Sequence, residues 1–503
     1  MMQELKRTVS YSYDKDSIAH SGHDEALQYI REQKKLAEKK LVRKLDMVIM
    51  PLTMLLYLAA YLDRSNLGNA KLQGLEKDIL NNDSNKFDWI ASMFYIAYVI
   101  FGLPVTLGVK YFDPSTWIAV CTIIWGTAST LHAATFNFAE LSAARVCLGI
   151  AEAGFGPSMT VYYSFFYTRD EIGLRNSLFI GSAAAAGAFG GLIAYGVSKI
   201  KSHIATWRIL FLIEGTPTIA LGLLGIFKVW FTANFAVFLL LPGRPETTRL
   251  LNEEERALAI ERMNRQSSAE APHTIVREQI FWALKDYKVW MCALVYQGLN
   301  VALSSISTFL PTIVKSLGYS NARAQLFSVP PYSVAFVVML LAAWNSDRVR
   351  NRGFHICPLA LVSALGYAIL SFEHHNDHVR YFATFLIVSG TYPGIPLTLS
   401  WVANNAATET KRTIATPMVI CLGHIFSIIG TRIFPRADAP RYKKGFAICL
   451  GGALWAAILS LLLSLLLRWQ NKRKDELHGK PVLHDKINTS EMGDSAPGFR
   501  FVP

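Results

Sequence analysis

The chain has 503 residues, of which 52 % are hydrophobic and 17 % are charged, and its mean hydropathy is +0.27. Soluble domains usually carry about 25 % charged residues, so this composition argues against a set of soluble domains. The formal net charge of +13 would suit a nucleic-acid partner. We expect no nucleic acid, because the cytoplasmic loops of membrane proteins collect Lys and Arg.

The apolar residues lie in long blocks rather than in alternation. A helix crosses a bilayer with about 20 mostly apolar residues, and the first 44 residues are too polar for a signal peptide. The sequence therefore predicts an all-α polytopic membrane protein with about twelve transmembrane helices, near residues 46–62, 88–109, 116–136, 140–167, 176–198, 207–241, 289–314, 325–344, 355–372, 379–403, 413–434 and 446–467.

These segments fall into two groups of six, which is typical of the major facilitator superfamily. The expected parts are a tail (1–44), a six-helix bundle (45–241), a linker (242–288), a second six-helix bundle (289–467) and a C-terminal tail (468–503) that looks disordered. With both tails and the linker inside, the inner segments hold most of the Lys and Arg, although the outer stretch "FPRADAPRYKKG" goes against this rule.

Two polar segments and one apolar run that is too long for a single span give three further expectations. "DEALQYIREQKKLAEKKLVRKLD" before the first span and "LNEEERALAIERM" in the linker predict surface helices. The sixth apolar run, 209–241, would be roughly 50 Å long as a helix, whereas the hydrocarbon core is about 30 Å thick. Residues 225–238 therefore look like an insertion, either genuine or a gene-model error.

Four charged residues within the predicted spans are the best pointers to function, because an ionisable group in a span is costly and usually faces the bundle interior. Asp63 and Arg64 end the first span, and Arg145 and Glu152 lie in the fourth. Seven residues are two helical turns, so Arg145 and Glu152 share a face about 10.5 Å apart. Two interpretations stay open: the charges lock the two helices together, or the acids exchange protons while an arginine binds an anion.

Several motifs resemble the anion:cation symporter family of the major facilitator superfamily, and within it the fungal allantoate permease branch, which includes nicotinate, pantothenate and biotin carriers. They are "YLDRSNLGNA" (61–70), "RVCLGIAEAG" (145–154), "WRILFLIEGTPT" (207–218), "FLPTIVKSLGYSNARAQLFSVPPY" (309–332), "LSWVANNAATETKR" (399–412) and "DAPRYKKG" (438–445). The resemblance runs from about residue 44 to 475.

The resemblance implies proton-coupled uptake of a small organic anion. By motif match, Asp63 and Glu152 fall on the family's proton-linked acids. Arg64 falls on a basic residue implicated in contact with the substrate carboxylate, and Arg145 on its fourth-span partner.

A gating signature of the superfamily is similar to "NSDRVRNRG", between the eighth and ninth spans, with Asp347, Arg348 and Arg352. Such a cluster either bridges helix ends and holds one gate state or anchors the loop at the cytoplasmic surface. The small residues of "GSAAAAGAFGGLIAYG" in the fifth span let helices approach closely. This span lacks the Gly-Pro pair of drug antiporters, which weighs against efflux by antiport but leaves export open.

Other substrate-binding candidates are polar or aromatic residues of the second bundle, each of which has helix packing as its alternative role. They are Asn300, Tyr392, Asn404 with its neighbour Asn405, and His424, which stands where the family more often has Asn. His424 is either a packed side chain or a second titrating group.

Weaker signals concern the outer loops and possible cofactors. "NDS" at Asn82 is a glycosylation sequon, and "EHHNDHVR" holds His374, His375 and His378, a poor metal site without Cys. The six Cys lie in apolar segments without a C-x-x-C pair. We expect no metal and no cofactor, and the sequence has no G-x-x-x-x-G-K-[ST] motif that would indicate ATP.

Together these features predict a secondary active transporter that takes up a small carboxylate with protons. The alternatives are a non-transporting nutrient sensor on the same fold and an exporter of a secondary metabolite. We expect no enzyme, since no nucleophile–base grouping is visible. The expected partners are the anion, protons and the lipid bilayer, and the expected state is a monomer in the plasma membrane with both termini cytoplasmic.

Overall fold

The computed structural model describes residues 2–106, 108–226, 241–248, 250–266, 277–373, 375–435, 438–439, 441–480 and 492–503. Twelve helices of eighteen residues or more make up most of these residues: α1 (Met2–Leu72), α3 (Ser84–Thr106), α5 (Pro114–Leu131), α6 (Phe138–Phe166), α7 (Arg169–Val197), α8 (Thr206–Ile226), α11 (Tyr287–Ser316), α13 (Val329–Val349), α14 (Gly353–Phe372), α15 (Asp377–Asn405), α16 (Glu409–Gly430) and α17 (Lys443–His478). The shorter helices are α2 (Leu75–Leu80), α4 (Gly108–Tyr111), η1 (His132–Ala134), α9 (Glu253–Gln266), α10 (Arg277–Lys285), α12 (Asn321–Phe327) and η4 (Gly493–Ser495).

The predicted all-α membrane fold is confirmed. No strand occurs among the described residues, and ten helices within them are long and apolar enough to cross a membrane by length and composition. The two long helices outside this group are α6 and α8. Helix α6 contains Arg145 and Glu152, and α8 contains Arg208 and Glu214.

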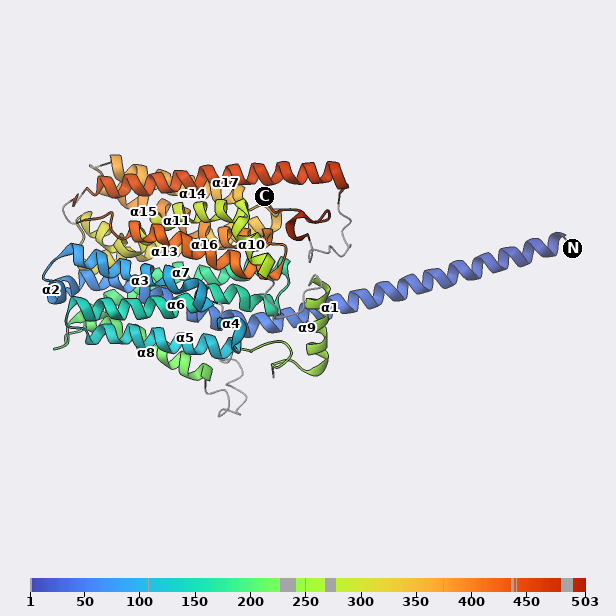
Figure 1. Cartoon of the computed structure of the whole chain (residues 1–503), viewed down its shortest axis with the longest axis horizontal. Coiled ribbons are helices and arrows are strands. Elements are labelled where there is room, and N and C mark those ends of the chain that lie inside the picture. Colours follow the sequence, from blue (N-terminus) through green and yellow to red (C-terminus); the bar gives the residue numbers. More distant parts are fainter. Residues whose placement is uncertain are drawn as a thin grey trace.

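The long helices lie side by side along one axis (Figure 1). In the first half α1 packs against α7, α3 against α6, and α5 against α8; in the second half α11 packs against α16 and α17, and α14 against α15 and α17. The halves meet through α7 with α13, α3 with α16, and α1 with α11. The fifth and eighth long helices therefore pair across the halves, as do the second and eleventh.

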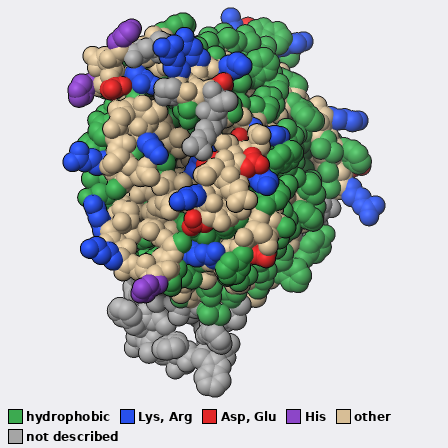
Figure 2. Space-filling model, turned by 90° about the vertical axis from the view of Figure 1, so that its left-hand side faces the viewer, with side chains coloured by type: hydrophobic (Ala, Val, Ile, Leu, Met, Phe, Trp, Pro, Cys, Tyr) green, Lys and Arg blue, Asp and Glu red, His purple; other side chains and the backbone are tan. Residues whose placement is uncertain are grey.

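Both chain ends lie toward the same end of the bundle, as do α4, α9 and α10 (Figure 1). We call this end the tail face and the other end, where α2 lies, the opposite face. Figure 2 views the opposite face, where charged side chains are spread over the surface and hydrophobic side chains gather on the flank. Large exposed apolar side chains of this kind indicate a flank that contacts lipid; they include Ile100, Phe101, Leu341, Trp344, Leu365, Phe382, Trp455 and Ile458.

Side chains at the loop ends determine where several helices begin. Asp113 accepts a hydrogen bond from the Thr116 amide at the start of α5, with Pro114 in the first helical position. Asn137 does the same for α6, and Asp286 for α11. Such caps satisfy amides that have no partner within the helix, so short polar loops are enough to separate the long helices.

The predicted surface helix of the linker is confirmed, since α9 lies beside α1 at the tail face (Figure 1). Lys34 and Lys44 of α1 pair with Glu261 and Glu255 of α9 at 2.5 and 2.6 Å. The helix predicted before the first span is continuous with that span in α1. The suspected insertion 225–238 lies, from residue 227 onward, outside the described residues.

The prediction of a disordered C-terminal tail is wrong for residues 492–503. Helix α17 continues to His478, and Phe499 and Phe501 are buried against the tail face. Lys474 of α17 donates hydrogen bonds to the carbonyl groups of Asp494, Ala496 and Phe499. We call residues 492–503 the C-terminal strap. Several of its carbonyl groups find partners on the folded bundle, such as Lys474, which the polar composition of the tail does not reveal.

Candidate functional site

Asp63 and Arg64 are neighbours on α1, but their side chains contact different helices. Asp63 accepts a hydrogen bond from the Ser129 hydroxyl of α5, whereas Arg64 Nε donates to Glu152 Oε2 of α6 at 2.5 Å. Successive residues of an α-helix are rotated by about 100°, so adjacent charges reach two different neighbours. This geometry explains why an acid and a base stand together at this point of the sequence.

Arg145 completes the cluster from α6. Its side chain is 2 % exposed, and its Nη1 donates to the backbone carbonyl of Asp63 at 3.4 Å. Nε and Nη2 have no hydrogen-bond partner in the part of the chain that the structure describes, although the guanidinium interacts electrostatically with Asp63 and Glu152. A buried arginine with spare donors beside two acids can receive a carboxylate, because guanidinium binds carboxylates through two parallel hydrogen bonds.

Aromatic rings surround Arg64 and continue into the second half. The guanidinium lies 4.8 Å from the ring centre of Phe94 and 5.5 Å from that of Tyr98, both on α3. His424 of α16 packs against Tyr98 with ring centres 4.5 Å apart. The charged groups of the first half thus meet the second half through an aromatic layer, which offers flat apolar surface next to a cation.

The structure brings three of the predicted second-half residues to this interface. The hydroxyl groups of Tyr392 and Tyr61 lie 2.9 Å apart across the two halves. Asn300 donates to the Tyr296 carbonyl at 2.9 Å and accepts from Ser427 at 3.4 Å. His424 is buried between α16 and α3. Their binding roles stay a prediction, supported by position.

Asn404 and Asn405 lie elsewhere. They are at the end of α15, twelve or more residues beyond Tyr392, and a helix rises about 1.5 Å per residue. The Asn405 amide donates to the Val502 carbonyl at 3.0 Å and its oxygen accepts from the Val502 amide at 2.8 Å. These two residues therefore lie at the tail face, where Asn405 binds the C-terminal strap, and they are not part of the central site.

Two of the three predicted gating residues form an ion pair at the tail face. Arg352 pairs with Asp347 and donates to the Ser346 hydroxyl at 3.0 Å. Both charged groups lie against Gly173 of α7, where even a β-carbon would contact them. Arg348 is exposed, with its guanidinium 5.6 Å from the Trp344 ring centre, so only Asp347 and Arg352 touch the first half.

The outer-loop predictions fall on the opposite face. Asn82 is exposed between α2 and α3, in a turn where its φ is 61°. His375 and His378 lie before and in the first turn of α15, while His374 is outside the described residues. Within the described ranges, no group of three His, Cys, Asp or Glu side chains is placed to hold a metal ion.

Sequence reasoning missed Glu214 of α8, which is 6 % exposed and accepts a hydrogen bond from the Asn66 amide of α1. It also missed Asp88 of α3, which is 4 % exposed near Lys71 and Arg432. The signal was present, because Glu214 interrupts an apolar run within "WRILFLIEGTPT". The rule that singled out Asp63 and Glu152 applies equally to it.

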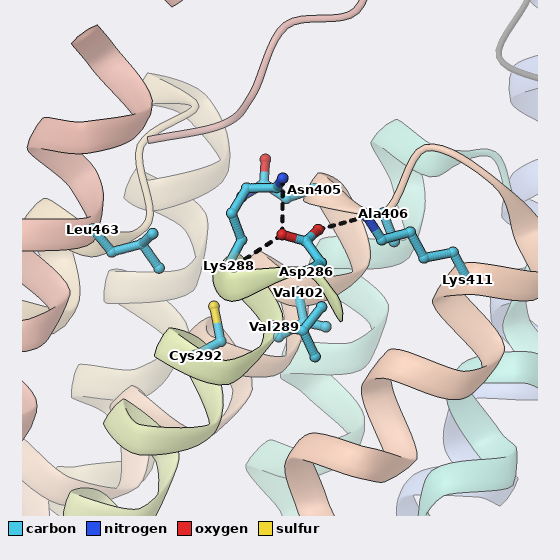
Figure 3. A pocket seen from close by; sticks show the side chains of 9 residues that line it. All are labelled: Asp286, Lys288, Val289, Cys292, Val402, Asn405, Ala406, Lys411 and Leu463. Atoms are coloured by element: carbon cyan, nitrogen blue, oxygen red, sulfur yellow. Dashed lines mark hydrogen bonds and ion pairs between the residues drawn. The ribbon is translucent and has the colours of Figure 1, made fainter. Parts of the chain in front are cut away.

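A separate pocket lies at the tail face and is charged in a different way (Figure 3). Asp286 sits between Lys288 and Lys411, with Nζ–Oδ distances of 2.9 and 2.5 Å. Asp494 of the C-terminal strap pairs with the same two lysines at 3.4 and 2.5 Å. Two acids thus balance two bases here. These ion pairs attach the C-terminal strap to the tail face, and they are separate from the central cluster.

Known proteins that are similar to this chain are transporters. The family model described as Major Facilitator Superfamily matches residues 53–431. The Major facilitator-type transporter hxnP of Emericella nidulans is 33 % identical over 475 residues, covering 92 % of this chain and 93 % of that protein. The High-affinity nicotinic acid transporter of Saccharomyces cerevisiae is 29 % identical over 473 residues, covering 92 % and 85 %.

Solved structures agree on the fold. The proton:xylose symporter XylE superposes with a TM-score of 0.59 over 84 % of this chain and 95 % of that one, at 15 % identity. A bacterial homolog of the human lysosomal transporter Spinster also gives 0.59, at 13 % identity over 84 % and 96 % of the two chains. On the family match and the full-length fungal relatives, the chain belongs to the Major Facilitator Superfamily and is a membrane transporter, not an enzyme.

Proposed function

We propose that the chain is a proton-coupled symporter of a small organic carboxylate, working by alternating access. The observation that carries this proposal is the buried cluster of Asp63, Arg64, Arg145 and Glu152, in which the Arg145 guanidinium keeps two donor nitrogens without a partner. Buried charges are costly unless paired. A cluster with spare donors therefore favours a transient anion over a purely structural lock.

The acids and the arginines supply the coupling. A substrate carboxylate that binds Arg145 or Arg64 competes with Asp63 and Glu152 for the same cations. Protonation of a carboxyl releases its arginine, so proton and anion arrive together and the site gains no net charge. A cluster with no net charge costs less to enclose between two apolar bundles, so closure is disfavoured when only one of the two ions is bound.

Contacts on the opposite face support a state closed on that side. Gly68 of α1 lies directly against the backbone of Thr308 in α11. Gln325 donates to the Asn69 carbonyl at 3.3 Å, and Asn321 donates to the Leu72 carbonyl at 2.8 Å. In the proposed cycle these contacts form the outer gate, and the Asp347–Arg352 pair against α7 belongs to the inner gate.

The aromatic layer favours a substrate that combines a carboxylate with a flat or apolar body. Phe94 and Tyr98 lie beside Arg64, and rings of this kind pack against planar ligands. A relative that carries the name nicotinic acid transporter is consistent with this preference. Allantoate, pantothenate and biotin remain members of the panel to be tested.

The proposed orientation in the membrane follows from the charge distribution and the fold. We place the tail face in the cytoplasm, because the N-terminal tail (1–44) and the segment from Arg468 onward are rich in Lys and Arg. A plasma-membrane site, a monomeric state and glycosylation at Asn82 on the outer side belong to the same proposal. The partners are the anion, protons and the bilayer.

The test uses purified protein in lipid vesicles with an imposed proton gradient. Labelled nicotinate, allantoate, pantothenate and biotin are offered in turn. We expect at least one to accumulate inside vesicles when protons flow inward, and accumulation to stop when a protonophore removes the gradient. Uptake that is indifferent to the gradient contradicts symport. Loss of preloaded substrate driven by an inward proton gradient favours export, and binding without movement favours a sensor.

A further inference from the structure

Glu214 is a third buried acid that the proposed cycle does not yet use. It lies on α8 and its Oε2 accepts a hydrogen bond from Asn66 Nδ2 of α1. Within the described ranges its Oε1 is buried without a hydrogen-bond partner, and so is Oδ1 of the same Asn66. Two orphaned oxygens that belong to one bonded pair are unusual, because buried polar atoms nearly always find partners.

Among the residues that the structure describes, no Lys or Arg forms an ion pair with Glu214. From α1 the nearest acid is Asp63, which interacts with Glu214 electrostatically. Arg64 of α1 points to Glu152 instead. Arg208, on α8 itself, donates to the carbonyls of Ala133 and Thr135.

Three other elements, α5, η1 and α7, pack against α8 and supply no positive charge to Glu214. Helix α5 contains no Lys, Arg, His, Asp or Glu, and its one cysteine, Cys121, carries no positive charge. From η1, His132 Nδ1 lies 2.6 Å from the Ala128 carbonyl, and its Nε2 is buried without a partner. A charged imidazole would leave that second N–H unpaired, so the ring is neutral. On α7, the charged residues Glu171 and Arg175 pair with Arg262 and Asp46 at the tail-face end.

Charge balance then requires a proton. The connected cluster holds three carboxyl groups, Asp63, Glu152 and Glu214, but only two guanidinium groups, Arg64 and Arg145. An uncompensated charge in this environment is neutralised by protonation. Glu152 pairs with Arg64, and Asp63 has the Ser129 hydroxyl and the field of Arg145. Glu214 has only a neutral amide.

We propose that Glu214 holds the resident proton of this cluster and sets the charge state of Asp63. A proton on Glu214 Oε1 can be donated to Asn66 Oδ1, which satisfies both orphaned oxygens with one bond. Carboxylic acid and amide then pair through two hydrogen bonds. Asp63 and Asn66 are three residues apart on α1 and share a helix face. The charge on Glu214 therefore acts electrostatically on Asp63.

The role of Glu214 in the transport cycle rests on the proposed function, whereas the presence of a proton on Glu214 does not. When Glu214 loses its proton, a second negative charge appears beside Asp63 and favours protonation of Asp63. The two acids therefore titrate as a coupled pair rather than independently. Glu214 is a positioning residue in this sense, since it acts on the site through Asp63.

The first test needs no substrate. Infrared difference spectra of the purified protein between neutral and alkaline pH report the carbonyl stretch of a protonated carboxyl. We expect a protonated-carboxyl band at neutral pH that is absent in Glu214→Gln and retained in Asp63→Asn. In Asn66→Ala the band should shift in frequency without disappearing, because the acid stays but its acceptor is gone. A band that persists unchanged in Glu214→Gln overturns the assignment, as does a band lost in Asp63→Asn alone.

The second test uses whichever of nicotinate, allantoate, pantothenate and biotin the unmodified protein accumulates. Glu214→Gln should shift the pH profile of uptake while retaining exchange of labelled for unlabelled substrate, since the amide mimics the protonated acid. An unchanged pH profile contradicts a link to Asp63. If the unmodified protein moves none of the four with protons, the symport proposal fails, while the infrared result still decides whether Glu214 carries the proton.

Discussion

At the scale of single residues, the central site depends on how adjacent charges diverge from one helix. Asp63 turns to α5 and Arg64 to α6, although they are neighbours in sequence. The sequence predicted both residues and the shared face of Arg145 and Glu152. It did not predict that Arg64, and not Arg145, makes the close ion pair with Glu152.

The two predicted proton-linked acids can be tested by neutral replacements. In Asp63→Asn and Glu152→Gln, we expect labelled substrate to equilibrate across vesicles without accumulating under a proton gradient, because no carboxyl remains to exchange the proton. Exchange of labelled for unlabelled substrate should continue. Glu140→Gln is a matched control, since Glu140 caps the start of α6 on the surface. Normal accumulation in both variants would refute the coupling role.

At the scale of helices, close contact between α7 and α13 depends on glycine. A β-carbon at Gly187 would lie 2.7 Å from the Tyr332 ring, whereas one at Gly196 of the same helix meets nothing within 4 Å. The small residues of the fifth span predicted a close approach of another helix. That this helix is α13 and that Tyr332 is the contacting residue is visible only in the packed structure.

We therefore expect Gly187→Ala to slow transport by about tenfold, because overpacking costs about 1–3 kcal/mol in one arrangement of the two helices. Gly196→Ala should transport normally. The measurement is the initial rate of substrate uptake in vesicles containing equal amounts of each protein. Equal rates for the two variants would show that this contact does not limit movement.

The tail face gives a prediction about pH. Burial alone would raise the pKa of Asp286, but Lys288 and Lys411 outweigh it and hold the pKa below the ordinary value of 3.8. A carboxyl with a lowered folded-state pKa stabilises the fold above its unfolded pKa, and this contribution is lost as pH falls through the folded pKa. The stabilisation is thus complete at neutral pH and disappears only in acid.

In Asp286→Asn we expect a loss of about 3 kcal/mol of stability at pH 7, since two lysines then share one acid. The difference from the unmodified protein should shrink below about pH 4. Thermal unfolding of both proteins in detergent across pH measures this. Asp377→Asn is the control, because Asp377 is largely exposed and pairs with Arg380 at 3.3 Å on the surface. A difference that stays constant with pH would contradict the ion-pair explanation.

At the scale of the whole molecule, alternating access requires the two halves to separate on the opposite face. Ser92 of α3 and Thr431, which follows α16, join their hydroxyls across the halves at 2.9 Å. Side chains that close can form a disulfide when both are cysteine.

Oxidised Ser92→Cys/Thr431→Cys protein should lose uptake, and a reductant should restore it, because the cross-link holds the halves together. Each single variant serves as a control for the six native cysteines. Uptake under oxidising and reducing conditions gives the readout. Full activity of the cross-linked protein would mean that this contact does not open during transport.

The fold class could be predicted because it depends on local properties. Apolar blocks of spanning length and capping residues are visible in the chain itself, and they set the number and boundaries of the helices. Asp63, Glu152, Arg64 and Arg145 could be predicted for the same reason, since a charge within an apolar block is a local anomaly. Glu214 carried the same signal, but its meaning required the packed structure, in which Arg64 and Arg208 contact other groups and Glu214 accepts a hydrogen bond from the neutral amide of Asn66.

By itself, the sequence determined an all-helical membrane protein with a charged pair in its first and fourth spans. The tertiary structure alone decided which charges meet, that Asn404 and Asn405 lie at the tail face, and that residues 492–503 dock there. The physical reason is that helix formation depends on neighbours along the chain, whereas ion pairing and docking depend on side chains from segments far apart in sequence. Their partners exist only once the helices have packed.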